Sequence, residues 1–250
     1  MNNPILVCQD NFAYAWSKAI IELNRNLWNA WNLVITICRP DQLDDEAVAL
    51  MTEFAQEQGL VLPWQVQHTI FPQRMYKQDR IKNRQKLYKC YNRFYRFTRK
   101  MPHRGWGTYF KRMISYTQKN GEEYDQLGNI IDKINNSASN YGASHIIFIP
   151  QIGVDTNRRM GSPCLNYITV QVEKTQSNRT ISLLAVYRNH DFRERAFGNY
   201  WGLCSLLKYM CTETDSMMGS ITCISSHAYV NTNKTELFSI AEKIAQKYEK

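Results

Sequence analysis

The sequence lacks several features that would place the protein in a common functional class. Its 250 residues contain no apolar run approaching the roughly 18 residues of a transmembrane helix. The first residues show no basic region followed by an apolar stretch and a small-residue cleavage site, so we expect no signal peptide. A glycine-rich phosphate loop, a zinc-binding cysteine spacing and the elbow of Ser-His-Asp hydrolases are also missing. We therefore expect no membrane partner and no metal cofactor.

The cysteines do not form a disulfide framework. Seven are present, an odd number, and none belongs to a Cys-x-x-Cys pair. Such scattered thiols are typical of a reducing compartment, which predicts a cytoplasmic location. With 44% hydrophobic and 21% charged residues the chain is globular. We find no internal repeat, linker or low-complexity tract, so residues 1–250 are expected to form a single domain.

Positive charge is concentrated in one segment. The net charge is +9, yet residues 74–104 hold twelve Lys or Arg and one acid, Asp79, while the rest holds 19 basic and 21 acidic residues. Six aromatic residues lie among these cations. Such a segment favours an amphipathic helix with an aromatic buried face and a solvated basic face. Its alternative function is nucleic-acid binding, through phosphate contacts and base stacking.

Hydrophobic periodicity predicts an α+β fold, with a mixed β-sheet flanked by helices. Expected helices cover residues 12–24, 44–58, 78–100, 124–135, 200–212 and 236–248. Expected strands cover residues 33–37, 146–149, 167–173, 181–187 and 221–230, and residues 61–71 are expected to hold one or two short strands. In the basic helix we expect Ile81, Leu87, Tyr88, Tyr91, Tyr95 and Phe94 to form the buried face.

One cysteine stands in an informative order of residues. Cys164 follows Ser162-Pro163 at a turn that leads into a predicted strand. Taken alone, a free Cys is most often a small buried apolar residue. Further along come Tyr187-Arg188-Asn189-His190-Asp191, then Asn199, then His227-Ala228-Tyr229-Val230-Asn231. Taken singly, each of these residues could have an ordinary structural role, so their order and spacing carry the information.

That order resembles the pyrimidine-nucleotide site of thymidylate synthases. The segments match the family's Pro-Cys nucleophile turn, its Gln-Arg-Ser-x-Asp motif and its His-x-Tyr-x-Asn strand. Asp125-Gln126-Leu127 looks like the family's Asp-Gln-Ile helix, and residues 106–111 are weakly similar to its Tyr-Gly-x-x-Trp-Arg loop. The similarity extends from about residue 105 to residue 231. It implies a thymidylate-synthase-like domain in a divergent member of that superfamily.

The resemblance also implies roles for the residues that carry the match. Cys164 would add to C6 of a pyrimidine ring, which is covalent catalysis. Arg188 would bind the 5′-phosphate and favour the thiolate. Asn199 has both a donor and an acceptor, so it could read O4 and N3 of uracil. The expected substrate is a pyrimidine nucleoside monophosphate.

Three further expectations come from the same resemblance. His227 and Tyr229 would bind the 3′-hydroxyl of the sugar, and Asp191 would orient the base or its loop. The one-carbon unit would come from 5,10-methylenetetrahydrofolate. The protein would be a homodimer packed through its sheet.

Several family features are missing. Leu165 stands where the family has His, and Ser144 and His145 stand where it has two arginines. Arg158 and Arg159 lie nearer to the cysteine but at a different spacing. Residues 81–101 contain no acid, so the family's general-base Glu has no counterpart, and its N-terminal Arg-Thr-Gly-Thr loop and C-terminal apolar tail are absent. The loss of the carboxylate and of the tail affects the one-carbon half of the site, whereas Cys164, Arg188, Asn199, His227 and Tyr229 retain its nucleotide half.

Three functions follow from these observations. The first is an enzyme that forms a Cys164 adduct with a pyrimidine nucleotide and methylates or hydroxymethylates C5. The second is a biosynthetic enzyme of the same fold that uses Cys164 on another substrate without folate. The third is a nucleotide- or nucleic-acid-binding module that works through the basic segment.

Overall fold

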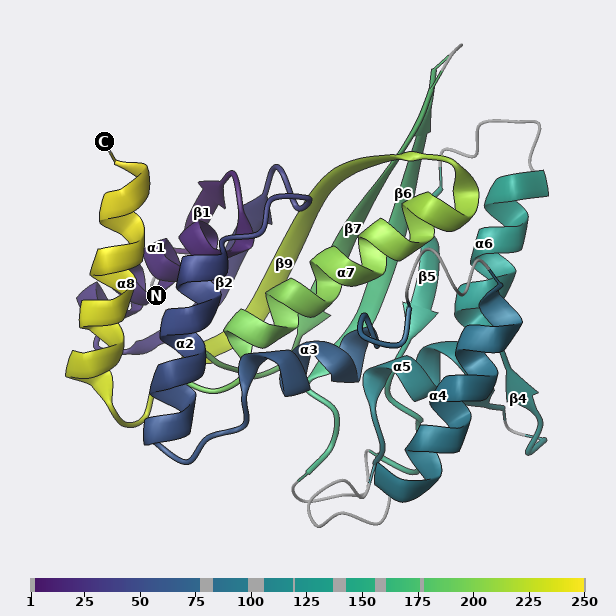
Figure 1. The fold of residues 1–250 in the computed structure, drawn as a ribbon, viewed down its shortest axis with the longest axis horizontal. Helices are drawn as coiled ribbons and strands as arrows, with labels where there is room; N and C mark the ends of the chain where they lie inside the picture. The colour runs from purple at the N-terminus through teal and green to yellow at the C-terminus, as the bar shows by residue number, and fades with distance from the viewer. Residues whose placement is uncertain are drawn as a thin grey trace.

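The centre of the structure is a mixed β-sheet, which is seen in the computed structural model behind a layer of helices (Figure 1). The structure describes residues 3–76, 83–98, 106–118, 120–136, 143–155, 161–175 and 178–249. The seven strands of the sheet are β1 (Ile5–Gln9), β2 (Asn29–Ile37), β5 (His145–Phe148), β6 (Leu165–Lys174), β7 (Arg179–Tyr187), β8 (His190–Asp191) and β9 (Met217–Tyr229).

The order of the strands brings distant segments together. They run β1-β2-β9-β7-β6-β5, and β8 pairs with β9 beside this path. The pairs β1–β2, β7–β9 and β8–β9 are parallel, and the other neighbours are antiparallel. Because β9 lies between β2 and β7, the ends of strands from both halves of the chain meet at one place.

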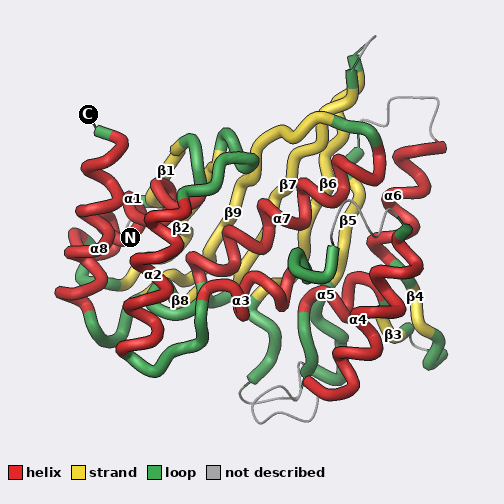
Figure 2. The backbone as a smooth tube through the Cα atoms, in the orientation of Figure 1, coloured by secondary structure: helices red, strands yellow, loops and turns green. Residues whose placement is uncertain are grey.

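Eight helices and a small hairpin complete the described part (Figure 2). The helices are α1 (Phe12–Arg25), α2 (Asp45–Glu57), α3 (Pro63–Ile70), α4 (Arg84–Thr98), α5 (Tyr109–Ile114), α6 (Gln126–Asn136), α7 (Ala196–Thr214) and α8 (Lys234–Tyr248). The hairpin is β3 (Tyr116–Thr117) with β4 (Glu123–Tyr124). No helix in the described ranges is long and apolar enough to cross a membrane.

Alternation along the strands separates the two faces of the sheet. On β9, Ile221 and Cys223 are fully buried, whereas Thr222 and Ile224, which alternate with them, are only partly buried. The same alternation holds on β7, and α7 crosses in front of β9, β7 and β6 (Figure 1). The helices therefore cover one face, and the opposite face is left half-exposed.

The fold class is confirmed, and so are most of the expected elements. Each predicted helix has a counterpart among α1, α2, α4, α6, α7 and α8, and each of the five predicted strands lies within or overlaps an observed one. On α4 the aromatic face packs inward as expected, with Leu87 and Tyr91 buried. Phe94 was wrongly assigned to that face, because 43% of it is exposed. Ile81 lies outside the described residues, and the single-domain expectation stays a prediction.

The prediction of strands over residues 61–71 was wrong. This segment forms helix α3, which begins with Pro63. Proline suits the first turn of a helix, where no donor is needed. The Gln65 side chain also accepts a hydrogen bond from the Leu62 amide at 3.1 Å. A short apolar run does not distinguish strand from helix, and here packing against α7 selects the helix.

The crossing of α3 and α7 yields a stability prediction. A Cβ added to Gly198 would lie 2.6 Å from the Pro63 carbonyl oxygen and 2.6 Å from Val66 Cβ. We expect Gly198→Ala to lower the free energy of unfolding by about 1–3 kcal/mol, because the two helices would be forced apart. The exposed Thr212→Ala on the same helix should change it by less than about 0.5 kcal/mol. Urea unfolding measures both, and equal effects would contradict this packing.

Candidate active site

The turn that carries Cys164 is held from both sides. Cys164 directly precedes β6, and its carbonyl oxygen accepts a hydrogen bond from the Arg188 amide at 2.9 Å. The Arg188 guanidinium donates to the carbonyls of Pro163 and Ser162 at 3.1 and 3.2 Å. The Ser162 hydroxyl donates to the Asp155 carbonyl at 2.7 Å. Arg188, at the end of β7, therefore fixes the position of the thiol.

The surroundings of the thiol act in opposite directions on its acidity. Cys164 is half-buried, and this burial raises its pKa. The positive charges of Arg188 and Arg195 lower the pKa, and the charge of Asp191 raises it. The expected influence of Arg188 is present, but burial outweighs it, so the pKa lies above that of an ordinary thiol. The free protein therefore holds Cys164 chiefly as a thiol at neutral pH.

Tyr109 borders Cys164 from helix α5. Its side chain is 8% exposed, and its hydroxyl interacts with the backbone amides of Leu165 and Cys164. Burial, and then the nearby Cys164 sulfur, raise the pKa of Tyr109, so its hydroxyl stays protonated. The Trp106 ring lies against it, with ring centroids 4.8 Å apart. Together they form an aromatic wall beside the cysteine turn.

A buried ion pair supports this wall. Arg112 binds Asp155, and both side chains are almost completely buried. The Arg112 guanidinium also donates to the carbonyls of Ile149 at 2.9 Å and Trp106 at 3.2 Å. Since Asp155 also accepts the Ser162 hydroxyl through its carbonyl, the pair connects the aromatic wall to the cysteine turn. Removing one partner would leave a buried charge uncompensated.

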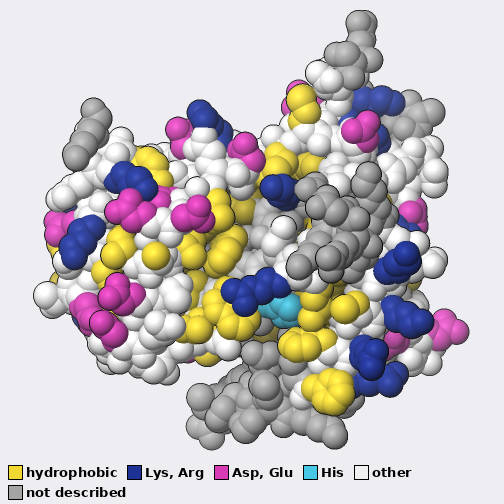
Figure 3. Space-filling view, in the orientation of Figure 1, with side chains coloured by type: hydrophobic (Ala, Val, Ile, Leu, Met, Phe, Trp, Pro, Cys, Tyr) yellow, Lys and Arg dark blue, Asp and Glu magenta, His cyan; other side chains and the backbone are white. Residues whose placement is uncertain are grey.

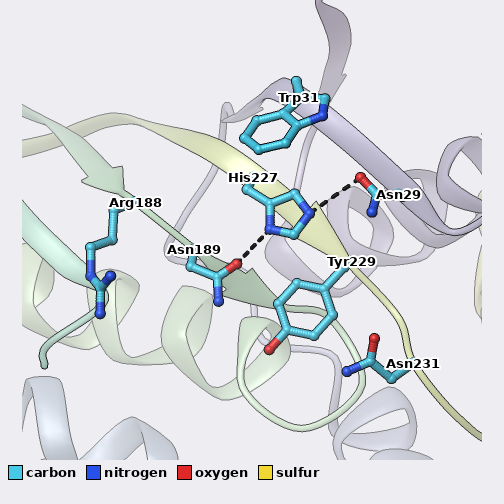
Figure 4. Close-up of a pocket in the computed structure, with 7 residues that line it drawn as sticks. All are labelled: Asn29, Trp31, Arg188, Asn189, His227, Tyr229 and Asn231. Carbon is cyan, nitrogen blue, oxygen red and sulfur yellow. Dashed lines mark hydrogen bonds between the residues drawn. The ribbon is translucent and has the colours of Figure 1, made fainter. Parts of the chain in front are cut away.

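A pocket of about 450 Å³ opens where β2, β9 and the turn after β7 meet (Figure 4). It is lined by Asn29, Trp31, Arg188, Asn189, His227, Tyr229 and Asn231.

His227 lies at the centre of the pocket, in the arrangement that Figure 4 shows. Its Nδ1 is 2.7 Å from Asn189 Oδ1 and its Nε2 is 3.2 Å from Asn29 Oδ1. The Trp31 ring covers the imidazole at a centroid distance of 4.7 Å, and the Tyr229 ring lies 5.3 Å away on β9. Burial lowers the pKa of His227, so the ring is neutral at pH 7.

Three sequence-predicted residues, Cys164, Asn199 and Asp191, lie outside the lining of this pocket. Asn199 is 3% exposed in α7, and its Nδ2 is 3.0 Å from His190 Nε2. Asp191 accepts hydrogen bonds from the Arg193 and Glu194 amides at 2.8 and 3.2 Å, so it shapes its own loop. The charge of Asp191 nevertheless reaches Cys164 and raises its pKa. The structure thus brings Arg188, His227 and Tyr229 into one pocket, whereas Asn199 is buried in α7 and does not line it.

Sequence reasoning missed several residues of the site. Asn29 and Trp31 belong to β2 and lie opposite Tyr229 and His227 in the β2–β9 register. Only the pairing of those two strands reveals them, and no local motif does. Asn189 and Asn231 were inside the motifs quoted above but had no role. Arg195 and Tyr109 act on Cys164 through the fold.

The basic segment presents a mixed surface on α4. Lys86, Lys89, Arg93 and Arg96 are exposed, and Phe97, which follows Arg96, is 72% exposed. Figure 3 shows Lys and Arg side chains gathered over this helix. Tyr88 and Tyr95, by contrast, pack on the core. Among the described residues, no group of three or more His, Cys, Asp or Glu side chains could hold a metal ion.

The contacts of His190 predict a pH dependence of stability. His190 Nδ1 is 2.8 Å from Ser225 Oγ, and complete burial lowers the pKa of His190 to about 3. In the unfolded chain it titrates near 6.5, so the neutral ring stabilises the fold above about pH 6.5 and this contribution is lost as the pH falls toward 3. The slope is at most about 1.4 kcal/mol per pH unit.

Urea unfolding of His190→Asn between pH 7.5 and pH 5 measures this contribution. The variant should lose most of that slope, while His227→Gln, whose ring is partly exposed, should keep it. An unchanged slope in His190→Asn would show that the buried ring is not the titrating group.

Comparison with known proteins gives a partial match. No family model matches the chain. A protein of Methanosarcina acetivorans named "Putative thymidylate synthase" is 27% identical over 123 residues, which are 49% of this chain and 52% of that protein. Proteins of the same name from Methanosarcina mazei and Methanococcoides burtonii are 30% and 25% identical over 125 and 123 residues, with the same coverage.

The chain therefore spans about half the length of the curated relatives it matches. The resemblance carried by the Cys164, Arg188 and His227 motifs agrees with these matches. Over about half of its length, this chain is a divergent relative of proteins named as thymidylate synthases.

Proposed function

We propose that the protein is a thymidylate-synthase-like enzyme that adds Cys164 to a pyrimidine nucleoside monophosphate and methylates or hydroxymethylates C5. One observation carries the proposal. Arg188 holds the turn that bears Cys164 and also lines the pocket that contains His227 and Tyr229. Cys164 does not itself line this pocket, but Arg188 links its turn to a pocket that offers a cation and two groups able to bind hydroxyls.

The nucleotide would bind through groups whose state is set by the pocket. Arg188 uses Nε and Nη2 for carbonyl oxygens, and Nη1 makes no hydrogen bond among the described residues, so it can donate to a phosphate oxygen. The neutral His227 ring can exchange its 3.2 Å contact with Asn29 for a sugar hydroxyl. Burial raises the pKa of Tyr229, which keeps its hydroxyl as a donor.

The covalent step would begin when Cys164 loses its proton. Its sulfur forms a bond to C6 of the ring, and the electron pair of the C5–C6 double bond moves toward C5 and O4, which makes C5 nucleophilic. After C5 has been substituted and has lost its proton, the C6–sulfur bond breaks and the double bond returns. Since burial raises the pKa of Cys164, the rate should rise with pH beyond neutrality.

We propose uracil as the favoured base on the resemblance at Asn199. Its Nδ2 already contacts His190, so one polar end of the amide remains for a base. That end can accept a hydrogen bond from N3–H of uracil. Because one end of the Asn199 amide is engaged, its selection against cytosine is weaker than that of an amide with both ends free.

The methylenetetrahydrofolate implied by the relatives fits the aromatic wall near Cys164. Trp106 is partly buried, with the Tyr109 ring 4.8 Å and the Arg112 guanidinium 5.4 Å from its ring centroid, and a pterin would stack on the part of the indole that stays exposed. We assign Trp106 as its contact. When bound, this cofactor supplies the one-carbon unit, while the residues described above bind and activate the nucleotide.

We also propose a homodimer formed through the open face of the sheet. This face carries a set of uncharged, partly or largely exposed side chains on β2, β5, β6, β7 and β9: Val34, Thr36, Ile146, Phe148, Tyr167, Thr169, Leu184, Val186, Thr222 and Ile224. Phe148 and Ile146 at the β5 edge are 53% and 46% exposed. An uncharged, flat face of this kind suits an isologous contact with a second copy.

Light scattering on a sizing column tests the dimer. The unmodified protein should elute as a dimer at micromolar concentration, and Val186→Arg should give a folded monomer with unchanged circular dichroism. Thr212→Arg on the outer side of α7 should remain dimeric. A monomeric unmodified protein, or a dimeric Val186→Arg, would contradict this interface.

Release of tritium from C5-tritiated uridine and cytidine monophosphates tests the reaction, with and without folate. We expect release to fall at least about 1,000-fold in Cys164→Ala, because the adduct cannot form. Arg188→Ala should raise KM at least about tenfold through the lost phosphate contact. Cys90→Ala, which removes an exposed thiol on α4, should behave like the unmodified protein. Release that does not depend on Cys164 would reject the proposal.

Use of Cys164 on a non-nucleotide substrate, and nucleic-acid binding through residues 74–104, remain the alternatives. The exposed cations and Phe97 of α4 are compatible with the second. Neither accounts for the joint position of Arg188, His227 and Tyr229 in one pocket.

A further inference from the structure

Two cysteines far from the candidate active site lie against each other at the edge of the sheet. Cys8 is on the edge strand β1, and Cys38 directly follows β2. Their sulfur atoms are 3.4 Å apart, and both residues are exposed. This contact is independent of the nucleotide pocket, which lies at the opposite end of β2 around Asn29 and Trp31.

The backbone holds this contact in place. Cys8 lies opposite Thr36 in the parallel β1–β2 register. Parallel pairing continues past the end of β2, because the Cys38 amide donates to the Gln9 carbonyl at 2.9 Å and the Arg39 amide donates to the Asp10 carbonyl at 2.7 Å. Cys38 is thereby kept beside β1, and the approach of the two sulfurs does not depend on a free loop.

The remaining five cysteines lie in different surroundings. Cys204, Cys211 and Cys223 are buried, and Cys164 is half-buried in its turn. Cys90 is exposed on α4 but has no sulfur neighbour among the described residues. Cys8 and Cys38 are thus the two thiols that are both exposed and in mutual contact.

We propose that Cys8 and Cys38 form a reversible dithiol–disulfide site that exchanges with low-molecular-weight disulfides of the glutathione type. The sulfurs need to approach by only about 1.4 Å to reach disulfide bonding distance. Both side chains are exposed in the single chain, beside Thr36 at the β1 edge of the face proposed above for the dimer, and rotation about their χ1 angles supplies this movement.

The exchange balances in two steps. The Cys8 thiolate attacks one sulfur of the small disulfide, forms a mixed disulfide and releases one small thiolate, which takes up a proton. The Cys38 thiolate then attacks the Cys8 sulfur, closes the Cys8–Cys38 bond and releases the second small thiol. The two protein thiols are oxidised by two electrons, and the small disulfide is reduced to two thiols.

The order of these steps follows from the hydrogen bond between the thiols. That bond, followed by burial and the negative charges of Cys8 and Asp10, raises the pKa of Cys38. Cys38 therefore keeps its proton at neutral pH, so the first attack is assigned to its partner in the contact. The attacking thiolate is accordingly Cys8, and Cys38 is the residue that resolves the mixed disulfide.

Closing this bond would constrain a large ring of the chain. The ring runs from residue 8 to residue 38 and contains α1 and β2. Strand β2 carries Asn29 and Trp31 into the pocket at its other end. Cross-linking a ring of this size removes conformational freedom from the unfolded chain, so the oxidised protein should be the more stable form.

Glutathione redox buffers and peptide mapping by mass spectrometry test the site on the full chain. As the buffer becomes more oxidising, we expect a Cys8–Cys38 cross-linked peptide, 2 Da lighter than the two reduced peptides, to appear while Cys90 is converted to its glutathione adduct. The thermal midpoint should rise by on the order of 10 °C on oxidation and return with a reductant.

Single-cysteine variants separate this site from general oxidation. In Cys38→Ser the Cys8 mixed disulfide should accumulate because nothing resolves it, and the oxidative rise in thermal midpoint should vanish. In Cys90→Ser both the cross-link and the rise should persist. Recovery of Cys8 and Cys38 as two separate glutathione adducts, or as free thiols in buffers that convert Cys90, would overturn the proposal.

Discussion

The candidate active site depends on the hydrogen bonds that Arg188 makes to the turn at residues 162–164. One side chain and its own amide hold three consecutive carbonyl oxygens, so the thiol of Cys164 cannot move independently of the end of β7. The same guanidinium lines the pocket. Cys164 and the Arg188 guanidinium are thereby fixed relative to each other before any ligand arrives, which is the preorganisation that the proposed covalent step would require.

Buried polar contacts and strand pairing support this contact from two sides. The buried pair of Arg112 and Asp155 connects the loop of Trp106, the end of β5 and the segment before Cys164. On the other side, β9 lies between β2 and β7 and carries His227 and Tyr229 to the same end of the sheet. The site is thus built from strand ends and supported by buried polar contacts, while burial holds both Cys164 and Tyr109 in their protonated forms.

Local sequence patterns predicted the helices and strands that are marked by a regular hydrophobic periodicity or a β-branched run. Amphipathic periodicity located α1 and α8, and β-branched runs located β6, β7 and β9. The prediction of strands over residues 61–71 failed because an apolar run of this length fits a strand or a helix equally well. Contacts with α7 decide between them. Edge strand β1 was missed because it is only five residues long and Leu6 is 75% exposed. Motif spacing gave Arg188, His227 and Tyr229, but Asn29 and Trp31 depend on strand pairing, and the contact of Asn199 with His190 depends on the packing of α7.

The central proposal is that Cys164 forms a covalent bond to a pyrimidine nucleotide held by Arg188, His227 and Tyr229. Mass spectrometry of the intact protein incubated with a 5-fluoropyrimidine nucleoside monophosphate, followed by peptide mapping, tests it most directly. When methylenetetrahydrofolate is included, fluorine on the substituted C5 cannot leave as a proton does, so the adduct should persist. The account predicts a mass increase equal to one nucleotide plus the attached folate, located on Cys164 and absent in Cys164→Ala. An unmodified Cys164 after incubation with saturating nucleotide, or an adduct on another cysteine, would contradict it.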